Sequence, residues 1–427
     1  MSSSGSCNLK LKIRGFKTID LYSYCPHTEL AAVKLRRQIN RIIHFFFPSV
    51  SHWATLARLL HWLTFLWLFV GLAILFSASS PVGAFSNNYS GDGLYYFKRQ
   101  LAWVLLGLVV FNLIVHFPLR HILGVSHWFV LVLLVLIAMT AIGVGTTTNG
   151  STRWLVLGPI AIQPSELIKP FLVLQSARIF GQWHRLSWNT RLFWLLIFVL
   201  VLLGILLQPN LSMTALCGMT LWLMALAAGL PYLYLLPLAA SGIILAYVSV
   251  SRQPYQKLRI ISFLNPWKYK DGIGYQLVQS LIAAGSGGTW GTGFGMSQQK
   301  LFYLPFQYTD FIFAVYAEEF GFAGSLLLLL LLLVYATLAL LVAFNTRHPV
   351  YRLVAVGAMI LMVGQSLLNI GVATGALPTT GLPLPLISYG GNSMITSLLV
   401  AALLIRVARE SSEAEVVLFQ GRQERYL

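Results

Sequence analysis

Apolar runs of about twenty residues recur along this chain and restrict its fold more than any other feature. One of them contains LLLLLLLLV at 326–334. A helix needs about twenty apolar residues to cross the ~30 Å hydrocarbon core of a membrane. Only 10% of the residues are charged, whereas soluble domains carry about a quarter. The sequence therefore predicts an all-α polytopic membrane protein and excludes soluble and disordered classes.

The apolar runs predict about ten transmembrane helices in one domain at 61–408. The polar segment 1–60 predicts a cytoplasmic N-terminal extension, and 409–427 a cytoplasmic tail. Residues 251–308, between the seventh and eighth runs, predict a large extracytoplasmic loop. The predicted spans are 61–80, 101–117, 122–143, 166–182, 192–208, 211–229, 231–250, 311–343, 352–374 and 386–408.

The chain is strongly basic, with 29 Lys and Arg against 12 Asp and Glu and a formal net charge of +17. In a membrane protein, basic residues gather on the cytoplasmic side of the spans. An even number of spans places both termini on one side, and most basic residues fall there. We therefore expect both termini to be cytoplasmic. We also expect contacts with membrane lipids and none with nucleic acid.

Acidic residues near the apolar runs are rare, and an ionisable group at membrane depth is a functional candidate because it is costly there. Asp310 directly precedes an apolar run that contains Glu318 and Glu319. On one continuous helix, Glu318 would lie about 80° around from Asp310. The two carboxylates are then predicted to share a cavity, where they could hold Mg²⁺ or Mn²⁺. A simple helix cap at Asp310 is the structural alternative.

A second cluster combines Arg153 with the segment QPSELIK, which contains Gln163, Ser165, Glu166 and Lys169. Ser165 is predicted as a helix N-cap with Glu166 in the first turn. Glu166 and Lys169 are three residues apart and share a helix face. The alternative is a local ion pair and cap without a role in binding.

Two segments rich in glycine or proline are predicted to be irregular. Residues 378–393 read PTTGLPLPLISYGGNS, which no regular helix accommodates. Free amides and hydroxyls there are predicted to face an anionic group, and tight packing is the alternative. Residues 285–295 read GSGGTWGTGFG. This run lacks the spacings of phosphate-binding loops and predicts a flexible loop.

Five long motifs occur in order: RWLVLGPIAIQPSELIK at 153–169, NPWKYKDGIGYQLVQSLIAAGSGG at 265–288, GTGFGMSQQKLFYLP at 291–305, TDFIFAVYAEEFGF at 309–322 and LPTTGLPLPLISYGGNS at 377–393. Together they resemble the FtsW/RodA/SpoVE (SEDS) family of bacterial cell-wall proteins. FSASSP at 76–81 and YYFKRQLAW at 95–103 are more similar to the family's division branch than to its elongation branch.

The resemblance implies a ten-helix peptidoglycan glycosyltransferase that polymerises lipid II into glycan strands for the septal wall during cell division. It implies Asp310 as the catalytic residue, and a carboxylate there suits a general base. Basic groups or a divalent cation would stabilise the leaving diphosphate, with Asp310 and Glu318 as the metal ligands. The substrate-binding residues would be Arg153, Gln163, Ser165, Glu166, Lys169, Lys300, Ser388, Gly390, Gly391 and Ser393.

The resemblance further implies a nascent lipid-linked glycan, a class B penicillin-binding protein transpeptidase and other divisome proteins as partners. It implies a location in the bacterial plasma (inner) membrane, at the division septum. Several positions depart from the family pattern. Tyr308 stands where many members have His, which argues against a required His in the reaction, and Phe306 stands where many have Glu, so one candidate acid or metal ligand is missing. Asn210 and Ser212 replace an Asp and a Gly, which argues against a catalytic role for that segment, and Asn392 replaces a Ser.

Two other functions fit parts of the sequence. A flippase or transporter for a lipid-linked oligosaccharide would also have charges at membrane depth and helices interrupted by glycine and proline. The lack of an internal repeat argues against it. A non-catalytic divisome scaffold would carry the same motifs without turnover. Consumption of lipid II discriminates the enzyme from both.

Overall fold

The computed structural model describes residues 8–11, 19–22, 53–85, 91–148, 151–158 and 160–423. The chain divides into two units, Met1–His52 and Trp53–Leu427. In the first unit, strand β1 (Asn8–Leu11) pairs antiparallel with β2 (Ile19–Tyr22). Most of the predicted N-terminal extension and the end of the predicted tail lie outside the described residues.

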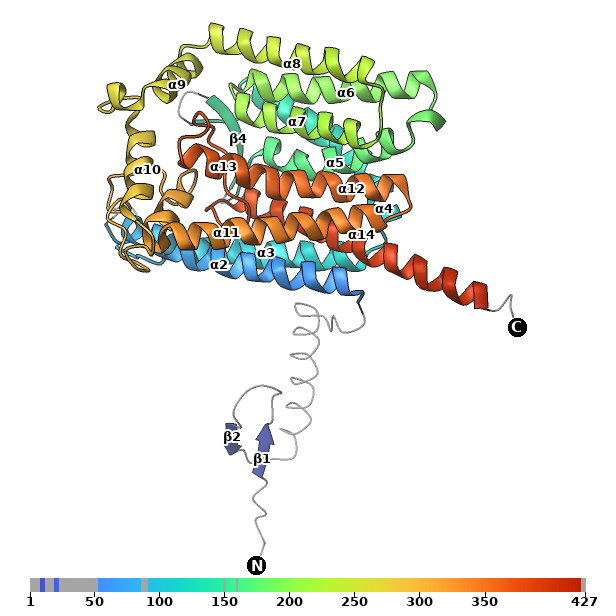
Figure 1. The fold of residues 1–427 in the computed structure, drawn as a ribbon, viewed down its shortest axis with the longest axis horizontal. Helices are drawn as coiled ribbons and strands as arrows, with labels where there is room; N and C mark the ends of the chain where they lie inside the picture. Colours follow the sequence, from blue (N-terminus) through green and yellow to red (C-terminus); the bar gives the residue numbers. More distant parts are fainter. Residues whose placement is uncertain are drawn as a thin grey trace, which may run out of the picture. The chain divides into compact units, whose positions relative to one another are not determined.

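The second unit is a bundle of long helices that lie roughly side by side (Figure 1). Its long helices are α2 (Thr55–Phe85), α3 (Tyr95–His116), α4 (Leu119–Ala141), α5 (Pro164–Gly181), α6 (Trp188–Leu207), α7 (Leu211–Ala227), α8 (Tyr232–Arg252), α11 (Ile312–Asn345), α12 (Pro349–Met359) with its continuation α13 (Gln365–Ala373), and α14 (Gly391–Gln423). A π-helical turn, Ile360–Gly364, joins α12 to α13.

Within the described residues, each of the ten predicted spans overlaps one of these helices, with α12 and α13 counted as one. Eight are long and apolar enough to cross a membrane. The other two are α7, which is apolar but short, and α5, which carries Glu166, Lys169 and Arg178. The all-α polytopic membrane class is thereby confirmed.

The helices differ in how far the bundle encloses them. The apolar window of α14 is 83% buried, whereas that of α8 is 11% buried. An apolar helix that protein does not cover must face lipid. Hence α14 forms the core of the bundle and α8 lies at its edge.

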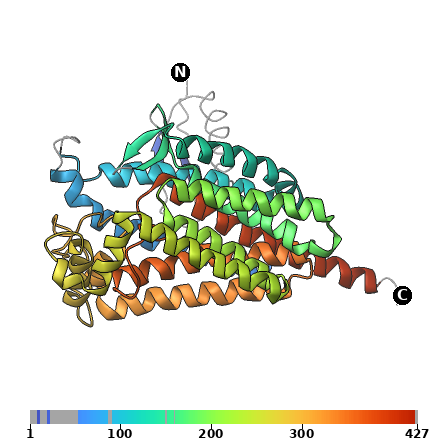
Figure 2. The same ribbon diagram turned by 90° about the horizontal axis from the view of Figure 1, so that it is seen from above.

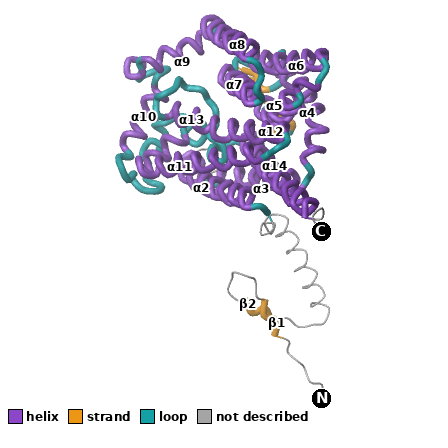
Figure 3. Tube along the Cα trace, turned by 45° about the vertical axis from the view of Figure 1, so that its right-hand side comes forward, coloured by secondary structure: helices purple, strands orange, loops and turns teal. Residues whose placement is uncertain are grey.

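The longest connections gather at one end of the bundle (Figure 2). A small antiparallel sheet, β3 (Thr146–Thr148), β4 (Ser151–Leu157) and β5 (Ile160–Ile162), precedes α5. The predicted loop 251–308 contains two helices, α9 (Pro254–Leu264) and α10 (Tyr275–Ser286). Figure 3 shows how little of this unit is strand.

The glycine-rich run is not the flexible loop that its composition predicts. Backbone amides of Thr292 and Gly293 donate to the carbonyls of Glu318 and Glu319, and Phe322 donates back to Gly288. The contact is possible because α11 is kinked at Gly321, which has φ +65°. A Cβ atom there would lie 2.3 Å from the Gly291 nitrogen.

We therefore expect Gly321→Ala to destabilise the protein by at least about 2 kcal/mol, because the left-handed backbone and the contact with Gly291 both oppose a side chain. The melting temperature in detergent measures this effect. Gly285→Ala is the matched control, since a Cβ at this helical position meets nothing within 4 Å. An equal loss in both variants would contradict the explanation.

Candidate functional site

A cavity of about 710 Å³ opens at the end of the bundle where the long connections gather. Its walls come from β4, the start of α5, α9, the residues before α11 and the segment 378–393. Of the residues predicted from sequence, it brings together Arg153, Gln163, Glu166, Asp310, Gly390, Gly391 and Ser393.

Asp310 lies in this cavity, two residues before α11 begins at Ile312. Phe311 occupies the N-cap position and no side chain caps the helix, so the cap alternative fails. Burial raises the pKa of the Asp310 carboxyl to about 6; Arg259 opposes this increase and Glu166 adds to it. A carboxyl with this pKa is available as a proton acceptor near neutral pH.

The backbone around Asp310 is held by the segment 378–393. Asn369 Nδ2 donates to the carbonyl oxygens of Asp310 and Leu382, at 2.8 Å in both cases. The Ser388 hydroxyl donates to the Thr309 carbonyl at 2.6 Å. Ser388 does not line the cavity, so its observed role is to join two irregular segments.

Gly391 shows why this segment needs small residues. A Cβ atom there would lie 2.5 Å from ring carbons of Trp103, and both residues line the cavity. Gly391 therefore lets the start of α14 approach α3 closely. Ser393, which is buried, and Gly390, which is half-buried, also line the cavity.

Two guanidinium groups line the cavity with Asp310. Arg153 donates to the carbonyl oxygens of Gln208 and Pro209, at 3.0 and 2.5 Å. Arg259 donates to the Thr379 carbonyl at 3.1 Å and lies over the ring of Tyr255. Burial lowers the pKa of Arg153, as does neighbouring Arg259. These contacts hold positive charge where an anionic group could bind.

Sequence reasoning did not select Arg259 as a site residue. It lies on α9, inside the segment predicted as a loop, among other basic residues of the same connection. The only local signal is Tyr255, four residues earlier and on the same helix face. Its hydroxyl accepts a hydrogen bond from Arg259 at 2.6 Å.

Glu166 and Lys169 form a buried ion pair of 2.7 Å within α5. Lys169 Nζ also donates to Gln365 Oε1 at 3.0 Å, and Gln365 Nε2 donates to the Pro383 carbonyl at 2.7 Å. Glu166 lines the cavity and Lys169 lies behind it. The pair thus connects α5, α13 and the irregular segment.

The prediction that Ser165 caps α5 is wrong. The helix begins at Pro164, with Gln163 at the N-cap position. Proline suits the first turn because its missing amide would have no helical partner there. Ser165 is consequently buried within that turn and does not line the cavity.

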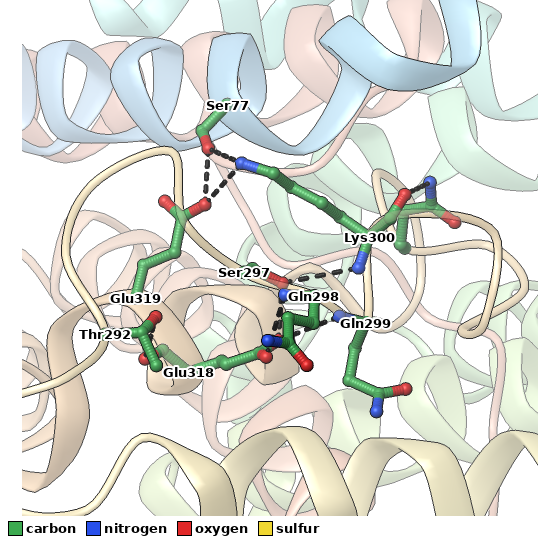
Figure 4. Close-up of polar contacts among 9 residues, drawn as sticks. Ser77, Thr292, Ser297, Gln298, Gln299, Lys300, Glu318 and Glu319 are labelled. Atoms are coloured by element: carbon green, nitrogen blue, oxygen red, sulfur yellow. Dashed lines mark hydrogen bonds and ion pairs between the residues drawn. The ribbon is translucent and has the colours of Figure 1, made fainter. Parts of the chain in front are cut away.

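Lys300 and Glu318 do not line the Asp310 cavity. Lys300 Nζ pairs with Glu319 at 2.7 Å and donates to Ser77 of α2 at 2.8 Å (Figure 4). Glu318 accepts hydrogen bonds from the Ser297 hydroxyl and the Gln298 amide. These groups fasten the segment before Asp310 to α2 and α11.

The expected cavity shared by Asp310 and Glu318 is not observed because Asp310 precedes the helix. The angular relation calculated for one continuous helix therefore does not apply. Among the described residues, no group of three or more His, Cys, Asp or Glu is arranged to hold a metal ion.

Residues 57–413 match the family model FtsW/RodA/SpoVE, described as cell cycle protein. The chain belongs to this family. It is 56% identical over 376 residues to the probable peptidoglycan glycosyltransferase FtsW of Synechocystis sp.. That match covers 88% of this chain and 95% of the relative.

Two solved structures share the fold. One comes from work on structural coordination of polymerization and crosslinking by a peptidoglycan synthase complex, with TM-score 0.68 and 28% identity; the match covers 84% of this chain and 99% of that one. The other is the rod shape determining protein RodA of Thermus thermophilus, with TM-score 0.62 and 27% identity, covering 85% and 99%. The likeness extends over the whole helical bundle.

Breaking the buried Glu166–Lys169 pair should lower the free energy of unfolding far more than breaking an exposed ion pair. Lys169→Met leaves the Glu166 carboxylate buried without its partner, so we expect a loss of about 3–5 kcal/mol. Lys98→Met breaks the exposed pair with Asp92 and should cost at most about 1 kcal/mol. Melting temperatures in detergent compare the two variants.

Adding Glu166→Gln to Lys169→Met should restore much of the lost stability, because no uncompensated charge then remains. If the double variant is no more stable than Lys169→Met alone, the loss comes from packing and the electrostatic explanation is wrong.

Proposed function

We propose that this peptidoglycan glycosyltransferase joins lipid-linked disaccharide units in the Asp310 cavity. One observation carries the proposal: Asp310, with its raised pKa, and the guanidinium groups of Arg153 and Arg259 line a single cavity. Glycan polymerisation needs a proton acceptor for the attacking hydroxyl and positive charge for the leaving diphosphate. The FtsW-type relatives named as peptidoglycan glycosyltransferases support this reaction.

In the proposed step, the 4-hydroxyl oxygen of an incoming lipid II attacks C1 of the growing glycan. The new O–C1 bond forms as the bond between C1 and the diphosphate oxygen breaks. The hydroxyl proton passes to an Asp310 carboxylate oxygen, and the undecaprenyl diphosphate leaves with the bonding electron pair. Arg153 and Arg259 stabilise the negative charge on that leaving group.

The residues present also fit a divalent cation held partly by substrate. Mg²⁺ is commonly bound by one or two protein carboxylates together with phosphate oxygens. Asp310 would be the protein ligand, since Glu166 is paired with Lys169 and Glu318 lies outside the cavity. When bound, Mg²⁺ or Mn²⁺ would neutralise charge on the diphosphate.

We further propose a class B penicillin-binding protein transpeptidase as the partner and the division septum as the location, with other divisome proteins present. The likeness to a chain from a synthase complex that couples polymerization to crosslinking supports this partner. The excess of basic residues on the side of both termini supports cytoplasmic ends.

Asp310→Asn should abolish glycan polymerisation while leaving the melting temperature nearly unchanged, because the amide keeps the shape but accepts no proton. The assay uses purified protein with its partner transpeptidase and lipid II, with Mg²⁺, Mn²⁺ or EDTA. Asp271→Asn, at an exposed acid of the same connection, is the matched control and should retain activity.

Polymer formation by Asp310→Asn would end the general-base assignment. If the wild type forms no polymer but moves a lipid-linked oligosaccharide between leaflets, the flippase function replaces the enzyme. If it does neither and Asp310→Asn still supports division in depleted cells, the scaffold function replaces it.

The raised pKa of Asp310, about 6, sets the pH dependence of the reaction. Only the ionised carboxylate accepts a proton, so kcat/KM should fall about tenfold per pH unit below about pH 6. Because Arg259 lowers this pKa, Arg259→Gln should move the acidic fall of kcat/KM to higher pH. An unchanged pH profile in this variant would contradict the assignment to Asp310.

A further inference from the structure

A second cavity, of about 550 Å³, lies at the opposite end of the bundle. Helix α5 runs from one cavity to the other. Gln163 at its start lines the Asp310 cavity, and Gly181 at its end lines the second cavity. Its 18 residues span about 27 Å at 1.5 Å per residue. This length is close to the ~30 Å hydrocarbon core, so the second cavity lies near the other membrane surface.

The lining of this cavity is positively charged and contains no Asp or Glu among the described residues. Arg185 comes from the connection between α5 and α6, whereas Arg347 and Arg352 come from the turn before α12 and its first turn. None of these arginines takes part in the ion pairs of the described residues. Three exposed guanidinium groups thus surround one concave space.

The two arginine-bearing segments are held together by close packing. A Cβ atom on Gly181 would lie 3.0 Å from the Val350 backbone, so the end of α5 meets the start of α12 directly. Free amides at the start of α12 add partial positive charge. This contact sets the position of the end of α5 against the start of α12.

Apolar residues form the other part of the lining. Phe180, Leu230 and Leu353 are buried, and Trp183 lies beneath the guanidinium of Arg191, with 5.1 Å from its carbon to the ring centroid. Tryptophan is typical of the membrane–water interface. A pocket with a basic rim and an apolar base fits a ligand that has a phosphate joined to hydrocarbon.

We propose that this cavity binds the head group of an anionic phospholipid, with phosphatidylglycerol as the probe. Basic pockets between transmembrane helices are known to hold such head groups. The positive-inside tendency alone predicts basic residues on this side, but it does not predict that three of them converge on a cavity with an apolar base. The inference does not depend on the chemistry proposed for Asp310.

The experiment measures binding of phosphatidylglycerol to the full-length protein in detergent by native mass spectrometry, with phosphatidylcholine as the neutral lipid. Arg185→Gln, Arg347→Gln and Arg352→Gln are combined in one variant. Each basic residue near an anionic lipid contributes roughly a fivefold gain in affinity, so the triple variant should lose about a hundredfold.

The matched control removes the same charge elsewhere. Lys257, Lys268 and Lys270 are exposed and lie outside this cavity, so their triple substitution by Gln should change phosphatidylglycerol binding less than threefold. Glycerol 3-phosphate tests whether the phosphate alone is enough. It should not compete at concentrations where phosphatidylglycerol saturates.

The proposal fails if phosphatidylglycerol and phosphatidylcholine bind equally, or if the two triple variants lose equal affinity. Competition by glycerol 3-phosphate at equal concentration would overturn the lipid and identify a soluble phosphate ester instead. The melting temperatures of both triple variants, measured without lipid, show whether each variant is folded.

Discussion

The buried ion pair between Glu166 and Lys169 is the interaction on which the site most depends. Two opposite charges in a low-dielectric interior stabilise a fold only when their remaining hydrogen-bonding capacity is also met. Gln365 accepts a hydrogen bond from Lys169 and donates one to the Pro383 carbonyl. The polar interior of α5 is thereby tied to the irregular segment that supports Asp310.

Irregular backbone at membrane depth is tolerated only where protein or water satisfies its polar groups. The segment 378–393 meets this requirement through side chains of regular elements. Asn369 on α13 donates to the Leu382 carbonyl of this segment and to the carbonyl of Asp310 beside it. Gln100 on α3 accepts a hydrogen bond from the Gly390 amide at 3.2 Å. The rigid helices thus position a loop whose own sequence cannot form a helix.

The fold was largely predictable, because a helix that crosses lipid needs a length of apolar sequence that is visible without a structure. Asp310 and Glu166 were also predictable, since acids near apolar runs are rare. Arg259 was not, because its role depends on where α9 folds back over the cavity. The pairing of Lys300 with Glu319 was not predictable either, because it depends on how the segment before α11 folds back against that helix.

The three acids near the start of α11 have different surroundings because the helix begins at Ile312, after Asp310 and before Glu318 and Glu319. Asp310 lies before the helix and keeps its carboxyl in the cavity, where burial raises its pKa. Glu318 and Glu319 lie within the helix, and their carboxylates accept hydrogen bonds from the segment that leads to Asp310. The two glutamates therefore hold the segment before α11 in place, and that segment carries Asp310 into the cavity.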